Sequence, residues 1–395
     1  LACSSAAGGL KIIAIGLVPE LTSEAAKRAA LGAGAKVIHT YSHNLNKSEA
    51  EAIVNSNADI ILLAGGTNGG DSRCIIHNAK MLADYGVRVP VVVAGNKSAE
   101  DEIIEIFKDK VEFHLAENVM PKINKLNVES ARETIRSIFM NNIVHAKGMT
   151  HVENNIDNIL MPTPAAVLKA AQTLSEGTDN EAGLGDLVVL DIGGATTDVH
   201  SAAEGDPTQG SVFLYGLPEA FLKRTVEGDL GMRYSLPTVA DVQGPHGLRH
   251  YLSKEYKYNI EEEVKKRNEH TDFISENAKD LAFDCAVAKV CADVSMGRHV
   301  GVLTPVYTGC GASFQQEGKD LTQLRYIIGT GGILVYNPNY KEIMDACKFR
   351  EDDPFSLKPK NPQFLLDKEY ILSAMGLLAT EDPDMAIRIM KKHLV

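Results

Sequence analysis

Apolar residues in positions 10–142 of the chain come in short runs, separated by stretches in which apolar positions recur every three or four residues. The short runs predict strands at residues 11–15, 36–40, 59–64, 90–94 and 111–115. The stretches between them predict helices at residues 23–31, 47–56, 72–85 and 99–107. Strands that alternate with helices in this way predict a parallel sheet covered by helices on both faces.

The pattern changes after residue 145, and we therefore expect two domains, 1–145 and 146–395. The second domain contains a strongly apolar strand at residues 187–191, which follows a polar linker. A helical subdomain is expected at about residues 218–300, where the chain is more charged. Within it, residues 261–267 place three glutamates beside two lysines and an arginine, which predicts a solvated helix surface.

Composition and net charge limit the classes of protein to which the chain can belong. A chain of 395 residues with 44% hydrophobic and 23% charged residues is typical of a globular protein with more than one domain. The net charge of −12, with no basic tract, opposes binding to nucleic acid or to an anionic membrane. No apolar run approaches the twenty or so residues of a transmembrane helix. The sequence leaves open whether the protein forms a homo-oligomer.

The cysteines and the first residues bear on the compartment. The six cysteines include no Cys-x-x-Cys pair, which favours reduced thiols in the cytoplasm over a zinc site. The first residues lack the basic and apolar regions of a signal peptide. Because the chain does not begin with Met, we also expect that its natural start is missing.

The strongest chemical signal follows the apolar strand at residues 187–191. Its residues are Asp191, Gly193, Gly194, Thr196, Thr197 and Asp198. The two glycines allow the backbone to approach an anion closely, and amides and Thr hydroxyls can then cradle phosphate oxygens. The two carboxylates are the hard oxygen ligands that a hydrated Mg²⁺ ion prefers. The sequence therefore predicts a site for a phosphate group and Mg²⁺, in which Asp191 and Asp198 are catalytic and metal-binding.

A second apolar strand, at residues 326–328, also ends in glycines. It is followed by Gly329, Thr330, Gly331 and Gly332. Small residues in this position permit close contact with a flat ligand such as a nucleotide base and its ribose. By itself this pattern is also typical of an ordinary strand and turn.

Three further features have both a functional and a structural interpretation. The glycine-rich residues 65–70 lie between a predicted strand and helix, where they would form either an anion site or a tight turn. His246 and His250 are four residues apart and could share a metal, although a surface pair is the simpler interpretation. Cys310 lies in a glycine turn and is more simply structural than nucleophilic.

Residues 191–198 resemble the second phosphate motif of the actin, sugar-kinase and heat-shock-70 superfamily, and residues 329–332 resemble its adenosine motif. Residues 162–167 resemble its connecting helix. The resemblance implies actin-like, ribonuclease H-like ATPase lobes that bind ATP and Mg²⁺, here preceded by the α/β lobe with the parallel sheet. The superfamily's first phosphate motif, Asp-x-Gly, is not found before residue 191, as expected if the natural start is missing.

A narrower resemblance covers nearly the whole chain. Four segments are similar to the MutL-type accessory proteins of glutamate (methylaspartate) mutase, at residues 4–11, 62–67, 161–171 and 327–337. This resemblance implies a slow ATPase that reactivates an adenosylcobalamin-dependent mutase by releasing damaged cobalamin. Two alternatives stay open: a small-molecule kinase of the same superfamily, and a binding module without catalysis.

Overall fold

The computed structural model describes residues 2–4, 10–33, 35–139, 159–308 and 311–395. The chain divides into two compact units. Unit 1 comprises residues 1–165 and 216–218, and unit 2 comprises residues 166–215 and 219–395. The boundary expected after residue 145 lies outside the described residues. No helix in the described residues is long and apolar enough to cross a membrane.

Unit 1 alternates strands and helices, as its hydrophobic pattern predicts. Its strands are β1 (Ala2–Ser4), β2 (Lys11–Gly16), β3 (Lys36–Ser42), β4 (Ile60–Leu63), β5 (Val91–Val93), β6 (Phe113–Leu115) and β7 (Ile159–Pro162). Its helices are α1 (Glu24–Gly32), α2 (Lys47–Val54), α3 (Arg73–Asp84), α4 (Glu100–Phe107) and α5 (Glu129–Ile138), with short helical turns at Pro19–Ser23 and Lys97–Ala99.

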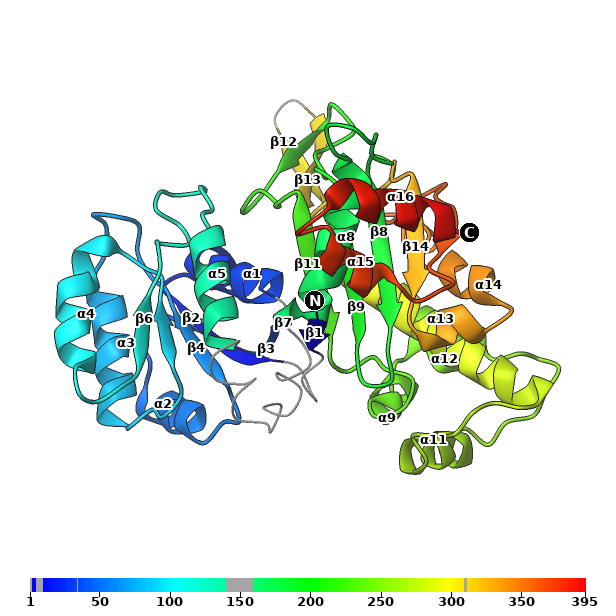
Figure 1. The fold of residues 1–395 in the computed structure, drawn as a ribbon, viewed down its shortest axis with the longest axis horizontal. Helices are drawn as coiled ribbons and strands as arrows, with labels where there is room; N and C mark the ends of the chain where they lie inside the picture. The colour runs from blue at the N-terminus through cyan, green and yellow to red at the C-terminus, as the bar shows by residue number, and fades with distance from the viewer. Residues whose placement is uncertain (1, 5–9, 34, 140–158, 309–310) are drawn as a thin grey trace. The chain divides into compact units, whose positions relative to one another are not determined.

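The main sheet of unit 1 has the strand order β3-β2-β4-β5-β6, and every pair of neighbours is parallel. Alternate residues of β2 enter two different cores: Ile12 packs with α1 and α5, whereas Ile13 packs with α2, α3 and α4. Figure 1 shows helices on both faces of this sheet. This confirms the predicted parallel sheet with helices on both faces. The prediction was possible because strands that are buried on both faces consist of nearly continuous apolar residues, a pattern visible in the sequence.

Unit 2 contains the apolar strand and both glycine motifs. Its strands are β8 (Leu187–Ile192), β9 (Thr197–Ala202), β10 (Val212–Leu214), β11 (Leu222–Glu227), β12 (Val302–Thr308), β13 (Gly311–Glu317), β14 (Tyr326–Thr330) and β15 (Gln363–Leu366). Its helices are α8 (Thr163–Glu176), α9 (Leu236–Ala240), α10 (Leu248–Tyr251), α11 (Ile260–Glu269), α12 (Ala278–His299), α13 (Gly332–Tyr336), α14 (Tyr340–Asp345), α15 (Leu372–Leu378) and α16 (Pro383–His393), with a turn at Gly244–His246.

The larger sheet of unit 2 has the order β11-β9-β8-β14-β15. Strands β8, β14 and β15 are parallel, whereas β9 runs antiparallel to both β8 and β11. The long helix α12 packs on one face through Val188 and Leu190 of β8, and α8, α15 and α16 pack on the other through Leu187 and Val189. A smaller sheet of unit 2 has the order β10-β13-β12. The chain thus belongs to the α/β class.

Two expectations for the helical region at residues 218–300 are corrected. Residues 222–227 form strand β11, which pairs with β9 along its whole length, and the charged Arg224 of this segment forms an ion pair with Asp198 of β9. The predicted solvated surface of α11 holds for Lys265 but not for Arg267, whose side chain is 0% exposed. In both segments a charged residue pairs with a carboxylate on another helix or strand.

Candidate functional site

The carboxyl ends of three parallel strands bring polar residues to one edge of the larger sheet. Thr330 at the end of β14 lies opposite Asp191 on β8, and Asp367 directly follows β15. The Thr330 hydroxyl donates to Asp367 at 3.0 Å, and Asp367 also accepts the amides of Ile371 and Leu372. Sequence reasoning missed Asp367. The available signal was a carboxylate immediately after an apolar strand, the same feature that identified Asp191.

Residues 193–196 form the loop between β8 and β9, and their backbone carbonyls accept hydrogen bonds from within the loop and from residues 232–235. The amide of Gly193 donates to the carbonyl of Thr196 at 2.9 Å. The carbonyls of Gly193 and Gly194 accept amides from residues 232–234, and the carbonyl of Ala195 accepts the Ser235 hydroxyl at 2.6 Å. The amides of Gly194, Ala195 and Thr196 have no acceptor within the described part of the chain. Successive unpaired amides are groups to which an anion can bind.

Gly331 is required where the second glycine motif meets this loop. Its φ of +93° lies in the region that favours glycine. A Cβ there would lie 2.5 Å from the carbonyl oxygen of Ile192 and 2.8 Å from the Asp191 carboxylate. By contrast, a Cβ on Gly332 would meet nothing within 4 Å. The two glycine motifs therefore pack against each other, as a site shared between them requires.

The predicted carboxylates are in different environments. Asp198 accepts Arg224 Nε at 2.9 Å and Nη2 at 2.6 Å, and its other oxygen accepts the Thr196 hydroxyl at 3.3 Å. Asp191 makes no side-chain hydrogen bond or ion pair with the described residues. Burial raises the pKa of Asp191 to about 7, and the negative charges of Asp198 and Asp367 add to this effect while Arg224 opposes it. The site therefore has an excess of negative charge centred on Asp191.

A cation beside Asp191 would relieve this excess. Among the described residues, no group of three or more His, Cys, Asp or Glu side chains is arranged to hold a metal ion. Magnesium, however, keeps several waters and often takes only one or two protein carboxylates together with phosphate oxygens. Asp191 suits that role, whereas the Arg224 ion pair already neutralises Asp198.

Thr197 does not reach the loop's exposed side. Its side chain is fully buried, and its hydroxyl donates to the carbonyl of Leu230 at 3.0 Å. The expectation that Thr197 binds phosphate through its side chain is therefore corrected. Thr197 is the first residue of β9, and the alternation of a strand turns its side chain into the core.

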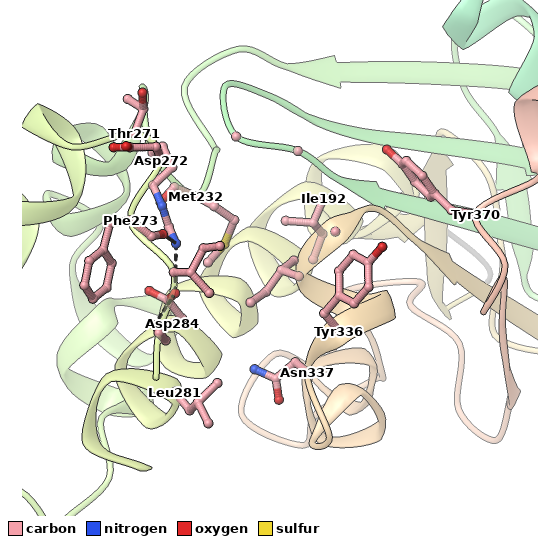
Figure 2. Close-up of a pocket in the computed structure, with 17 residues that line it drawn as sticks. Ile192, Met232, Thr271, Asp272, Phe273, Leu281, Asp284, Tyr336, Asn337 and Tyr370 are labelled. Carbon is pink, nitrogen blue, oxygen red and sulfur yellow. Dashed lines mark hydrogen bonds and ion pairs between the residues drawn. The ribbon is translucent and has the colours of Figure 1, made fainter. Parts of the chain in front are cut away.

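A cavity of about 660 Å³ opens beside the loop. It lies between the loop, the segment at residues 271–284 and the short helix α13, as Figure 2 shows. Its lining includes Gly193, Gly194 and Gly332, together with mostly apolar side chains such as Ile333 and Leu281. The loop with the unpaired amides thus borders a pocket large enough for an organic group.

Buried ion pairs hold one wall of this cavity. Asp284 accepts Arg267 Nε at 2.7 Å, Arg233 Nη2 at 3.0 Å and the Ser275 hydroxyl at 2.8 Å. Arg233 Nη2 also donates to the carbonyl of Phe273 at 2.9 Å. These contacts connect the segment at residues 271–275 to α11 and α12. The wall therefore has a defined position without a ligand.

The remaining sequence candidates have structural partners where they are described. In the loop at residues 65–70, Asn96 bonds Gly69, Gly70 and Asp71, and Asn118 donates to the carbonyl of Gly66 at 3.0 Å. These contacts favour the tight-turn interpretation. His246 contacts Asp293 at 2.7 Å, and His250 lies edge-on to Tyr251. Cys310 lies outside the described residues.

Two buried histidines make stability depend on pH. His200 and His299 are fully buried, and burial lowers the pKa of His200 to about 3 and that of His299 well below its usual value. In the unfolded chain each has a pKa of about 6.5 and takes up a proton below it. Their contribution to stability is therefore lost as the pH falls below 6.5.

We expect His299→Gln to reduce the loss of stability between pH 7.5 and pH 5.5 by about 1.4 kcal/mol, one histidine's share. Urea unfolding at the two pH values measures this difference. The raised pKa of Asp191 acts in the opposite direction over the same window, so the comparison with wild type is essential. His250→Gln, at an exposed position, serves as the control. An unchanged pH dependence in His299→Gln would contradict the prediction.

Two comparisons relate this chain to known proteins. The model of the MutL protein family matches residues 1–394 of the chain. Protein MutL from Clostridium tetanomorphum is 59% identical over 396 residues, which cover 100% of this chain and 86% of that protein.

Proposed function

The chain belongs to the MutL family, and on this premise we propose that it is a slow ATPase that reactivates an adenosylcobalamin-dependent mutase by releasing damaged cobalamin. Glutamate mutase is the partner that the sequence resemblance implies. The observation that carries the ATPase part is the loop at residues 193–196, whose carbonyls are engaged and whose three unpaired amides lie beside Asp191 and the 660 Å³ cavity.

The larger sheet of unit 2 supports an actin-like lobe. The hairpin β8–β9 carries the phosphate loop, and the parallel strand β14 delivers the second glycine motif to the same edge. This is the arrangement that the resemblance to the actin-like ATPases implies. The phosphates would occupy the loop, and the nucleoside would occupy the cavity lined by Gly332 and Ile333.

The residues of the chain would then mainly position the nucleotide and stabilise the charge of its phosphates. Amides of Gly194, Ala195 and Thr196 donate to phosphate oxygens, where they favour the charge of the transferring group. Asp191 would hold a Mg²⁺ ion, which supplies neutralisation of phosphate charge when bound. Arg224 pairs with Asp198 and orients it at the adjacent position of β9. No carboxylate is assigned as a base for water, which suits slow, switch-like hydrolysis.

Reactivation requires the protein to favour an open form of the mutase. If that form is about 1% populated, roughly 2.7 kcal/mol of differential binding brings it to parity with the closed form. A change of conformation between nucleotide states would supply different contacts to the mutase, which is the general requirement for such coupling. Nucleotide hydrolysis would then reset the protein for another round.

We expect the full-length protein with MgATP to restore activity to a hydroxocobalamin-inhibited mutase when fresh adenosylcobalamin is added. A non-hydrolysable ATP analogue should permit a single round of release at most, because hydrolysis is needed to reset the protein. The measurement is mutase activity against time, with the released cobalamin followed by its absorbance.

Three outcomes would contradict this function. Reactivation without nucleotide, or repeated rounds with the analogue, would exclude the ATP-driven mechanism. Transfer of the γ-phosphate to a hydroxyl or carboxylate acceptor would identify a kinase instead. A protein that binds neither ATP nor ADP would be a binding module without catalysis.

A further inference from the structure

We propose that Asn337 selects the base of the bound nucleotide by donating a hydrogen bond from its side-chain amide to a ring nitrogen of a purine. The inference rests on the proposed function, since it concerns the same cavity, and it adds a residue that determines specificity. Asn337 directly follows α13, the helix that begins at Gly332 beside the phosphate loop. The base donor and the second glycine motif are therefore parts of one short segment.

The orientation of the Asn337 amide is determined by its neighbour. Its Oδ1 accepts the backbone amide of Asn339 at 2.9 Å, so the Nδ2 atom must occupy the opposite side. That Nδ2 is buried and has no hydrogen-bond partner among the described residues. Figure 2 shows it directed into the cavity toward Leu281. The residue as a whole is only 4% exposed, so the donor belongs to the wall of the cavity and not to the open surface.

The local sequence explains why Asn337 holds this position. Pro338 follows it, and the residue before a proline avoids the helical region. Asn337 accordingly has φ −90° and ψ 124°, which ends α13 and turns the side chain across the cavity. A buried amide donor without a partner is uncommon and unfavourable. A ligand acceptor at this place would remove that unfavourable term.

Asp284 is another polar residue that lines the cavity, as are Thr271, Asp272 and Ser275. The carboxylate of Asp284 is already engaged by Arg233, Arg267 and Ser275. Asn337 adds an unpaired donor to this lining. A base edge that carries an unprotonated ring nitrogen complements this arrangement, whereas an edge that presents only N–H groups does not.

The apolar lining indicates a flat ring. Ile274 is 78% exposed and Tyr336 is 83% exposed, and both line the cavity. Exposed apolar and aromatic side chains beside a buried polar donor are typical of pockets for planar heterocycles. Ile274 belongs to the segment before α12, and Tyr336 belongs to α13. A purine would cover both while its edge reaches Asn337.

The test compares ATP with its 1-deaza, 3-deaza and 7-deaza analogues, each of which replaces one ring nitrogen by C–H. Binding is measured by calorimetry on the full-length protein with Mg²⁺. We expect one analogue to bind wild type about tenfold more weakly than ATP, since it lacks the acceptor for Asn337. Asn337→Asp should weaken ATP binding by about tenfold or more and abolish the discrimination against that analogue.

Asn337→Asp keeps an oxygen that can accept the Asn339 amide and replaces the donor that faces the cavity by an oxygen of a carboxylate, so a charge-matched control is needed. Asn339→Asp makes the same chemical change two residues away at an exposed position and should bind ATP like wild type. The wild-type analogue series remains decisive if the Asn337 variant does not fold.

The outcomes separate this inference from the proposed function. If ATP binds but all three analogues bind wild type equally well, the role of Asn337 is overturned and the ATPase proposal stands. The same conclusion follows if a folded Asn337→Asp discriminates among the analogues as wild type does. If neither ATP nor ADP binds, both proposals are overturned.

Discussion

Asp191→Asn should lower the ATPase rate of the full-length protein by at least about a hundredfold, the scale on which removal of a single charge-stabilising group acts in an active site. Asp191 is the carboxylate at the loop without an ion pair among the described residues, and we propose it as the metal ligand. Asparagine has nearly the same shape but no charge, so the dependence of the rate on Mg²⁺ should also weaken. Phosphate release at several Mg²⁺ concentrations measures both effects.

The Asp191→Asn variant should lose ATPase activity without losing stability. Because the pKa of Asp191 is raised to about 7, its ionised form is unfavourable in the folded protein, and Asn should leave thermal stability at pH 8 unchanged or higher. Asp241→Asn is the matched control, since Asp241 is exposed and lines no part of the cavity. Full ATPase activity in a well-folded Asp191→Asn protein would exclude the proposed role.

Arg267→Met should destabilise the protein by about 3–5 kcal/mol, because the buried carboxylates of Asp280 and Asp284 each lose one of their cations. Arg267 pairs with Asp284 at 2.7 Å and with Asp280 at 3.1 Å, and its guanidinium lies over the ring of Phe283. Asp284 in turn holds Arg233 at the cavity wall. Urea unfolding measures the loss, and nucleotide affinity should fall with it.

A double variant and a surface control separate the pairing from simple packing. Arg267→Met combined with Asp284→Leu should recover part of the stability, since the buried carboxylate that lost this cation is then removed as well. Lys265→Met on the same helix replaces an exposed cation and should change stability by no more than about 0.5 kcal/mol. A loss below 1 kcal/mol in Arg267→Met would show that the buried network contributes little.

The sequence by itself determined the elements whose signal is local. The strands of unit 1 were predictable because they are buried on both faces, so that residues 60–63 of β4 are apolar without interruption. The position of the loop at residues 193–196 was predictable for a similar reason. An apolar strand, a carboxylate and two glycines occur there in immediate succession, and each has a preferred local geometry.

Only the tertiary structure decided which distant residues complete the site. Asp367 reaches the edge beside Asp191 because β15 pairs with β14, a neighbour that no local pattern specifies. Arg267 is buried rather than solvated because Asp280 and Asp284 of another helix face it. The side-chain nitrogen of Asn337 has no partner because its oxygen accepts the Asn339 amide while the nitrogen faces the cavity. Burial and pairing depend on contacts between segments, and these are properties of the packed chain.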